Sequence, residues 1–594
     1  MNARHLALCA LALGCDAAAG GGTSNTTTDA STPRDTGGSV RDVPVVPADA
    51  PLPMPSCAAA TGGGREATMP PRQTLALSGL DGDAWLASPG VADLDGDGRP
   101  EVVVARERSV AVYGHDGAMR WRANAGSGRV WASPVVVDLD GDGRLDVAAA
   151  SGDAVAAFNA QGQPLRGFPA RWRSELRALA AGDLDGDGRA ELVAASTTTL
   201  RESGQRDFLM AWRGDGSAMP GWPPNTGGSS GCDDSCYVTG GFDQNLAVGP
   251  LDGDTSMDVL APMDNAYISW HHGSGEAFRA ASIFRRVTRV PGVRFLHDYA
   301  EAMQGYSERE DSSDQAHFTN TAPAIVDLDG DGRREIVALA SVQNASQSDR
   351  ERGVALWALR PDGTRVPGWE RPFEVRPYLA GLRDLGDNIV GATNQVAVAD
   401  LQPESAGPEM VFAGFDGRVW CVGADRSGRW STVYTTDTTV LTAGVVIADL
   451  TGDGRPEVIF ATYSASAGGA ALYVLDARGM IQQRVALPGR GAMAVPAVAD
   501  LDGDGALELL VSLKDTTPRG EGVLVFTVPG SSTGCAPWPT GRGNLLRNGT
   551  PTGPLALTPA PLPRSAQDRP HLWERFAREF PSDSRSRRGR TRDA

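Results

Sequence analysis

Short runs of Val, Ala, Leu and Ile alternate along most of this chain with Gly-rich polar turns, and each run has the length of a β-strand. One stretch is typical, with apolar runs at residues 133–137, 145–150 and 154–158 and a weaker run at 164–168. Long stretches with the 3.6-residue period of an amphipathic helix are scarce. The pattern therefore predicts an all-β protein built from four-stranded units.

A short acidic turn recurs eight times between these runs, and its first copy reads Asp93-Leu94-Asp95-Gly96-Asp97-Gly98-Arg99-Pro100-Glu101. The copies begin near residues 93, 138, 183, 250, 327, 400, 449 and 500. A strand-rich repeat at this spacing is typical of a propeller or another array. One such sheet cannot bury both faces alone, and a closed ring removes the exposed edges. We therefore expect a closed β-propeller with eight blades, and seven blades as the alternative.

The turn carries carboxylates at its first, third, fifth and ninth positions, and the carbonyl of the seventh residue can add another oxygen. Several carboxylates with oxygen-only coordination suit a hard cation, and flexible coordination by six to eight ligands favours Ca²⁺ over Mg²⁺. Gly98 permits the positive φ angle of a sharp turn. Without a cation, the clustered negative charges would repel one another. The sequence thus predicts structural calcium sites.

An EF-hand is the main rival for such a turn. It requires a bidentate Glu at the twelfth position and a helix on each side. The first two copies have Val104 and Ala149 there, and their flanks are strand-like. We therefore reject the EF-hand.

Five copies hold four carboxylates, and the copy at residue 449 replaces one of them with a hydroxyl. This count predicts five or six bound calcium ions. With the seventh-position carbonyl included, the expected ligands are Asp93, Asp95, Asp97, Arg99, Glu101, Asp138, Asp140, Asp142, Arg144, Asp146, Asp183, Asp185, Asp187, Arg189, Glu191, Asp327, Asp329, Asp331, Arg333, Glu335, Asp449, Thr451, Asp453, Arg455, Glu457, Asp500, Asp502, Asp504, Ala506 and Glu508.

Two copies are eroded, and we expect no calcium at them. Pro250 stands where the first Asp should precede Asp252, Asp254 and Asp258. The copy at Asp400 has one extra residue before its last acid, Glu409.

The two ends of the repeat region are expected to meet. The last unit has no evident outer strand, and residues 73–79 precede the first unit as an outer strand would. This N-terminal strand would complete the last blade. Cys57 and Cys535 lie just outside the repeats, and a disulfide between them would staple the ends. Cys232 and Cys236 are close enough in sequence to form a second, small disulfide ring.

These motifs resemble those of the FG-GAP/VCBS repeat propellers, whose blades carry an Asp-x-Asp-x-Asp-Gly-x-x-Asp/Glu loop, as in the head of integrin α subunits. The resemblance covers residues 73–550 and includes the ending Trp538-Pro539-Thr540-Gly541-Arg542-Gly543-Asn544, which is similar to a segment that follows such propellers in bacteria. It implies a calcium-bearing propeller, and the remaining 551–594 are expected to be a Pro-rich, then basic, tail.

The first residues predict export. Residues 1–15 have a basic start, a short apolar core and a small residue before Cys15, which resembles a bacterial lipoprotein signal with Leu11-Ala12-Leu13-Gly14-Cys15 as lipobox. Cys15 would then carry the lipid, and residues 16–72 would form a flexible tether. The expected location is the cell envelope or surface, with a plainly secreted protein as the alternative.

A formal charge of −18 argues against nucleic-acid partners, and against membrane contact other than through the lipid. The leading hypothesis is a monomeric, calcium-stabilised surface module that binds a protein or glycan. The alternative is an extracellular polysaccharide-active enzyme, because similar eight-bladed propellers occur among rhamnogalacturonan lyases. His271, His272, His297 and His317 would then be the candidate bases, although histidines in polar loops are more often solvated than catalytic. We expect a binding protein rather than an enzyme.

Overall fold

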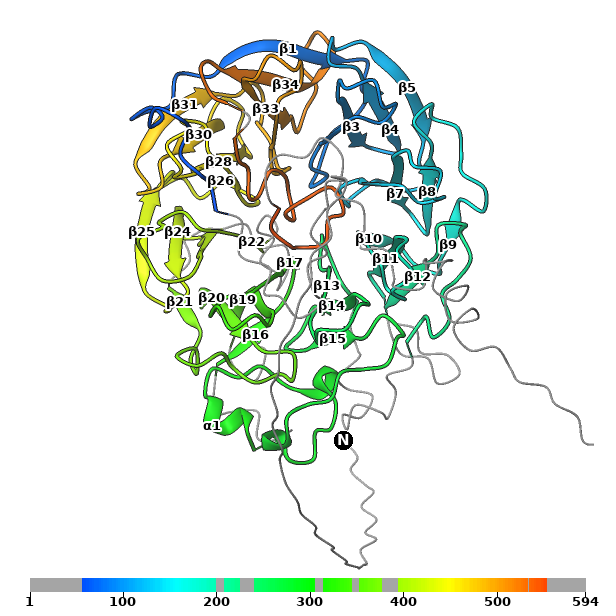
Figure 1. Ribbon diagram of the computed structural model, residues 1–594, viewed down its shortest axis with the longest axis vertical. Helices are drawn as coiled ribbons and strands as arrows, with labels where there is room; N and C mark the ends of the chain where they lie inside the picture. Colours follow the sequence, from blue (N-terminus) through cyan, green and yellow to red (C-terminus); the bar gives the residue numbers. More distant parts are fainter. Residues whose placement is uncertain are drawn as a thin grey trace, which may run out of the picture. The chain divides into compact units, whose positions relative to one another are not determined.

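The computed structural model describes residues 56–198, 208–224, 240–304, 314–343, 352–376, 394–532 and 534–552. In these ranges the chain forms a ring of eight blades, each a sheet of mainly antiparallel strands with its first strand toward the centre (Figure 1). The prediction of an all-β propeller with eight blades is confirmed, and the seven-bladed alternative is wrong. Cys15, the Cys232–Cys236 pair and the tail beyond residue 552 lie outside the described residues.

Blades 1, 2, 7 and 8 are plain four-stranded sheets. In order from the centre they comprise β2 (Gly90–Ala92), β3 (Glu101–Arg106), β4 (Ser109–Tyr113) and β5 (Met119–Asn124); β6 (Val135–Val137), β7 (Asp146–Ser151), β8 (Ala154–Phe158) and β9 (Ala170–Arg171); β27 (Val446–Ala448), β28 (Glu457–Ala461), β30 (Ala471–Leu475) and β31 (Ile481–Ala486); and β32 (Ala497–Ala499), β33 (Leu507–Ser512), β34 (Glu521–Val528) and β1 (Arg72–Ser78).

Blades 5 and 6 each gain one strand. Blade 5 comprises β18 (Ala324–Val326), β19 (Glu335–Gln343), β20 (Val354–Leu359) and β21 (Phe373–Val375), with β16 (Gln315–His317) also paired to β19. Blade 6 comprises β22 (Asn394–Ala399), β23 (Glu409–Ala413), β24 (Arg418–Gly423) and β25 (Gly428–Val433), with β17 (Thr321–Ala322) parallel to β22. Two short strands, β26 (Val440–Leu441) and β29 (Tyr463–Ser464), pair with each other. In sequence β26 precedes the first strand of blade 7, and β29 lies between its second and third strands.

Blades 3 and 4 have three named strands in the described residues, where four were predicted. They comprise β10 (Leu176–Gly182), β11 (Glu191–Ser196) and β12 (Leu209–Trp212), and β13 (Ala247–Gly249), β14 (Asp258–Pro262) and β15 (Ile268–His271). After the third strand of each of these blades, the described residues form an isolated bridge, Trp212 with Ala218 and His271 with Ala277.

After blade 4 the chain forms the 3-10 turns η2 (Ser282–Phe284) and η3 (Val290–Gly292) and the one-turn helix α1 (Tyr299–Ala302). Over the described ranges, no helix is both long and apolar enough to cross a membrane.

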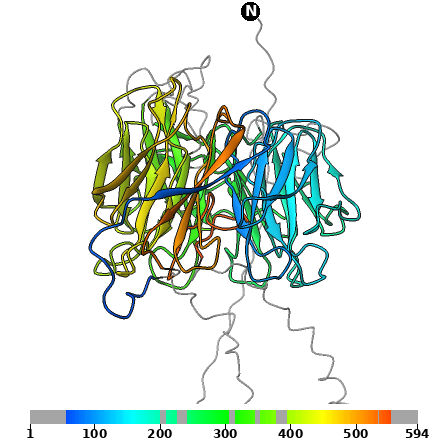
Figure 2. The same cartoon turned by 90° about the horizontal axis from the view of Figure 1, so that it is seen from above.

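The ring closes as predicted. Strand β1 pairs antiparallel with β34 from Arg72–Thr527 to Ser78–Glu521, so the N-terminal strand is the outer strand of blade 8 (Figure 2). Cys57 and Cys535 form a disulfide with Cα atoms 5.5 Å apart across a sequence separation of 478 residues. Strand pairing and the disulfide therefore both join the two ends of the repeat region.

The core lies between the faces of neighbouring blades. Every residue of β3 and β7 is buried, and Val103 and Val112 of blade 1 share one cluster with Val136 and Val147 of blade 2. Burial on both faces explains why the second and third strands read as unbroken apolar runs. The outer strand β5 alternates between exposed and half-buried residues, as expected for a strand with one solvated face.

Residues 534–552, here called the central segment, lie in the middle of the ring (Figure 1). Inner-strand amides of blades 2, 3, 4, 5, 7 and 8 donate to its carbonyl oxygens; the pairs are Val136–Leu545, Ala181–Leu546, Val248–Asn548, Ile325–Gly549, Ile447–Trp538 and Val498–Pro539. Thr540 Oγ1 donates to the Pro89 carbonyl beside blade 1, and the Arg542 amide donates to Gln395 Oε1 of blade 6. The segment thus bonds to all eight blades.

Two buried arginines hold the central segment in place. Arg547 is fully buried and its guanidinium makes five hydrogen bonds, with the carbonyls of Ser88, Pro89, Pro134 and Gly541 and with Thr540 Oγ1. Arg542 donates to the carbonyls of Leu179 and Leu246 at 2.7 and 2.6 Å and to Gln244 Oε1 at 3.4 Å. Burial lowers the pKa of both guanidinium groups to about 9. Backbone carbonyl dipoles, rather than carboxylates, therefore solvate these charges.

We expect Arg547→Met to lower the free energy of unfolding by about 3 kcal/mol or more, because several buried carbonyls lose their donor. Calorimetric or urea unfolding measures this loss. The exposed Arg166 supplies the control: Arg166→Met should change stability by no more than about 0.5 kcal/mol. Equal free energies of unfolding for the two variants would contradict the stabilising role of Arg547.

Candidate metal centres

The acidic turns join the first and second strands of each blade. Because every inner strand runs in the same direction, all eight turns lie on one face of the ring. The connections between second and third strands, and those between blades, lie on the opposite face. The acidic turns are therefore separated from the side chains of the opposite face by the length of the strands.

Each intact loop is ordered by its own carboxylates. Asp93 accepts hydrogen bonds from the amides of Gly96 at 2.8 Å and Gly98 at 2.9 Å. In all six predicted sites the sixth-position glycine bonds in this way to the first Asp; these are Gly98, Gly143, Gly188, Gly332, Gly454 and Gly505. Their φ angles lie between +84° and +88°, which a residue with a Cβ rarely adopts.

The seventh-position residues also behave alike. Their amides donate to the fifth-position carboxylate; the donors are Arg99, Arg144, Arg189, Arg333, Arg455 and Ala506. This Asx-type turn fixes the fifth acid and the peptide that follows it.

The ninth-position acid makes one hydrogen bond that is common to all eight copies. One carboxylate oxygen accepts from the amide of the second residue, which is leucine every time; the pairs are Leu94–Glu101, Leu139–Asp146, Leu184–Glu191, Leu251–Asp258, Leu328–Glu335, Leu401–Glu409, Leu450–Glu457 and Leu501–Glu508. This leucine was not among the residues predicted to matter, although it recurs at the second position of every copy.

The first, third and ninth acids converge at the intact loops. In the copies at residues 93, 138, 183 and 327, one oxygen from each of these three acids lies within 4.8 Å of the others. An oxygen-only set of several carboxylates fits a hard divalent cation of the calcium type. These first, third and ninth acids are among the ligands predicted from the sequence.

Burial of the ninth acid makes its charge costly. It raises the pKa to about 7 for Glu101, Asp146, Glu335 and Glu508, and to about 8 for Glu191 and Glu457. The neighbouring loop carboxylates raise it further by like-charge repulsion. A bound divalent cation would hold these acids in the ionised form.

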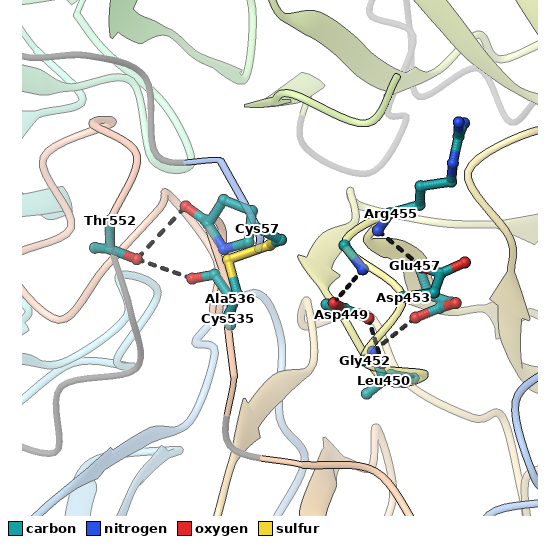
Figure 3. Close-up of a disulfide and its surroundings, with 12 residues drawn as sticks. Cys57, Asp449, Leu450, Gly452, Asp453, Arg455, Glu457, Cys535, Ala536 and Thr552 are labelled. Carbon is teal, nitrogen blue, oxygen red and sulfur yellow. Dashed lines mark hydrogen bonds between the residues drawn. A yellow bond between two sulfur atoms is a disulfide. The ribbon is translucent and has the colours of Figure 1, made fainter. Parts of the chain in front are cut away.

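The blade 7 loop is covered by the segment that the disulfide anchors. The amides of Ala60 and Arg65 donate to the carbonyls of Gly452 and Thr451, and the Asp449 amide donates to the Cys535 carbonyl. Figure 3 shows the Cys57–Cys535 disulfide beside this loop. As a result Asp449 and Thr451 are buried.

The two eroded copies differ from each other. In blade 6, Glu409 Oε2 accepts from both Leu401 and Gln402, and the Arg429 Nε atom lies 3.6 Å from Glu409 Oε1. In blade 4, the imidazole of His272 lies against Asp252 and Asp258, and hydrogen bonding to Asp258 raises the pKa of His272.

The four histidines named as candidate bases have separate partners. His271 bonds to Ser269 Oγ at 2.7 Å, and His297 bonds to Glu374 at 2.5 Å. His317 bonds to Thr319 Oγ1 at 2.6 Å, and only His272 lies at an acidic turn. The structure thus assigns these side chains to different local networks.

The opposite face carries a group of side chains here called the aromatic cluster: Trp85, Arg129, Trp131, Arg177 and Lys514. The two tryptophan rings have centroids 5.2 Å apart. The Arg129 guanidinium lies 5.0 and 5.2 Å from them, and that of Arg177 lies 3.9 Å from Trp131. Lys514 Nζ lies 3.3 Å from the Trp85 centroid.

Acids surround the aromatic cluster. Lys514 Nζ pairs with Asp83 at 2.8 Å, Arg177 pairs with Asp243 at 3.0 Å, and Trp131 Nε1 donates to Glu175 at 2.8 Å. Burial lowers the pKa of Lys514, the only lysine of the chain, to about 8. These residues are far apart in sequence, so no local sequence motif could predict the cluster.

A pH dependence follows from the raised pKa values of the ninth acids. When metal is chelated, the folded state binds protons more tightly than the unfolded state, so stability falls as the pH rises from about 4.5 through about 7 to 8. With EDTA we therefore expect a higher Tm at pH 6 than at pH 8, measured by scanning fluorimetry.

The matched variants are Glu191→Gln, which removes one buried charge, and Glu66→Gln at an exposed position. The first should narrow the difference in Tm between the two pH values, and the second should leave it. An EDTA-treated protein that is more stable at pH 8 than at pH 6 would contradict the assignment.

Residues 80–149 match the model of the FG-GAP-like repeat, and no curated protein matches the sequence. Among solved structures, the chain is similar to the V. cholerae biofilm matrix protein Bap1, with 15% identity, coverage of 84% of this chain and 97% of that chain, and a TM-score of 0.46. It is similar to the Bacillus licheniformis rhamnogalacturonan lyase PL11, with 16% identity, 84% coverage of both chains and a TM-score of 0.41. At this level of identity the likeness concerns the fold alone. The chain is an eight-bladed β-propeller that contains the FG-GAP-like repeat.

Proposed function

We propose that this protein is a calcium-stabilised propeller that acts as a binding module for a protein or glycan at the cell surface. The observation that carries the proposal is the set of acidic loops, in which carboxylates from the first, third and ninth positions converge. The metal has a structural role in this proposal, and the ligand binds elsewhere on the ring.

The case for calcium rests on charge and on ligand type. Each of the five fully acidic loops brings four carboxylates to one turn, one of them buried with a raised pKa. Extracellular calcium at millimolar concentration fills sites of modest affinity, and an ion that binds only the folded state stabilises it. Ion binding at the turns would therefore stiffen the face from which the second strands start.

The case for a binding surface rests on the aromatic cluster. Tryptophan and arginine dominate the energetics of many interfaces, since they combine apolar area with directed polar groups. In this cluster Arg129 and Arg177 keep about a third and a fifth of their side chains exposed. The cluster lies on the face away from the acidic loops, so a ligand there leaves the metal sites undisturbed.

We place the protein outside the cytoplasm, anchored by a lipid on Cys15. The Cys57–Cys535 disulfide supports this location, because such bonds persist in oxidising compartments. Cys421, which is buried and free, is compatible with the same setting.

Calcium removal should lower the Tm by about 10 °C or more, since several sites each contribute on the order of 2 to 3 kcal/mol when saturated. Calorimetry in Ca²⁺ and in EDTA measures the difference. The double variant Asp183→Asn/Asp187→Asn should lose part of the calcium effect, whereas Asp116→Asn at an exposed turn should retain all of it. An unchanged Tm in EDTA would refute the metal's structural role.

The binding face is tested with Trp131→Ala/Arg177→Ala. Proteins and acidic polysaccharides from cell-envelope extract are captured on the wild type, and the affinity of each captured ligand is then measured for the variants. We expect a loss of tenfold or more for the double variant and no loss for Met480→Ala, which alters an exposed apolar residue elsewhere. Ligands that bind the double variant and the wild type equally would exclude the aromatic cluster as the binding site.

A further inference from the structure

Blade 4 keeps the shape of an acidic loop but has lost one of its ligands. The Leu251 amide donates to Asp258 at 2.9 Å and the Asp254 amide donates to Asp252 at 3.1 Å, as their counterparts do in the intact copies. Pro250 offers no carboxylate at the first position, and Thr255 replaces the sixth-position glycine. The loop therefore retains three acids where an intact copy has four.

The imidazole of His272 supplies a third donor atom beside two of the remaining acids. Its Nδ1 atom lies 3.1 Å from Asp252 Oδ2 and 3.3 Å from Asp258 Oδ1. These three donor atoms lie within 4.8 Å of one another, as do those of the first, third and ninth acids in the intact copies. One nitrogen thus substitutes for one oxygen in an otherwise similar group.

The neighbouring blades carry arginine at the position that corresponds to His272. The bridges of Trp212, His271 and Leu359 align the third strands of blades 3, 4 and 5, so His272 corresponds to Arg213 and Arg360. Those arginines pair with the third-position acids Asp185 and Asp329 at 3.3 and 3.2 Å. A guanidinium has no lone pair for a metal, whereas an imidazole is a common metal ligand.

The site is rigid on one side and open on the other. Asp258 is fully buried, and the His272 ring stacks on Phe278 with centroids 3.9 Å apart. Asp252, His272 and Phe278 also line a cavity of about 430 Å³, together with Glu276, Arg289 and Asp362. An ion can therefore reach the Asp252 and His272 donors from solvent, with Asp258 behind them.

We propose that Asp252, Asp258 and His272 form a site for a divalent transition metal of the zinc type, distinct from the calcium sites of the intact loops. A set of one imidazole and two carboxylates suits Zn²⁺ or Co²⁺ better than Ca²⁺, which prefers oxygen and more negative charge. In a tetrahedral zinc site with bonds of about 2.0 to 2.1 Å, two donor atoms lie about 3.3 Å apart. The distances from His272 Nδ1 to Asp252 Oδ2 and Asp258 Oδ1, 3.1 and 3.3 Å, agree with this donor separation. Three protein ligands leave a further position for water or another molecule.

The rival explanation is a protonated histidine that pairs with the two acids and binds no metal. The test uses the full, untagged protein in millimolar Ca²⁺, titrated with Co²⁺ while the visible absorption of the metal is followed. We expect a low-symmetry, nitrogen-containing Co²⁺ spectrum that saturates at one site per chain and is displaced by Zn²⁺ but not by added Ca²⁺.

His272→Arg is the key variant, because it installs the residue that blades 3 and 5 carry and should fold. It should lose the Co²⁺ signal, with at least tenfold weaker binding and an unchanged Tm in Ca²⁺. Asp252→Asn, at a more exposed ligand, provides a second variant with the same expected loss, and His115→Arg is the matched control that should bind normally.

Three results would overturn the proposal. Absence of Co²⁺ and Zn²⁺ binding by the wild type would establish an ion pair only. An equal signal from His272→Arg would place the metal at other residues. Displacement of Co²⁺ by millimolar Ca²⁺ would make blade 4 an ordinary member of the calcium series.

Discussion

The hydrogen bond from a leucine amide to a buried carboxylate, repeated in all eight blades, is the constraint on which the repeat depends. It closes the turn between the first and second strands and fixes the point at which each second strand begins. The eroded copies at residues 250 and 400 keep it, while the other three acids vary. The bond therefore serves the fold first, and the proposed cation sites build on a turn that already exists.

Because the leucine hydrogen bond is kept in every blade, the loops can differ in the groups that surround the buried carboxylate. Where all four acids are present, buried negative charge accumulates, and a bound hard cation would neutralise it. Blade 6 places Arg429 near its acid, and blade 4 places His272 there. The ninth acid is thus paired with different side chains in the two blades: Arg429 lies on the outer strand of blade 6, and His272 directly follows the third strand of blade 4.

Much of the fold could be predicted from the sequence because its signals are local and periodic. The acidic turn recurs with the same spacing of side chains, and the missing outer strand of the last unit pointed to residues 73–79.

From the sequence, the central segment could be recognised only as the segment that ends the repeat region. Its Arg547 binds carbonyls of Ser88 and Pro134, more than 400 residues away, and carbonyls have no sequence signature. His272 was visible as a histidine, but its place beside Asp258 depends on how two strands of blade 4 pair. The aromatic cluster likewise required the ring to close before Lys514 could lie over Trp85.

The central segment also limits how this architecture can evolve. Propellers gain blades when a repeat is duplicated in the gene, and each added blade widens the hole that the inner strands enclose. Here the hole is filled by a peptide of fixed length whose carbonyls accept from six inner-strand amides. Its Arg547 side chain bonds beside blade 1, and its Arg542 amide bonds to blade 6. A ninth repeat would leave those groups too far from their partners, so growth by tandem duplication would need a simultaneous redesign of the filling peptide.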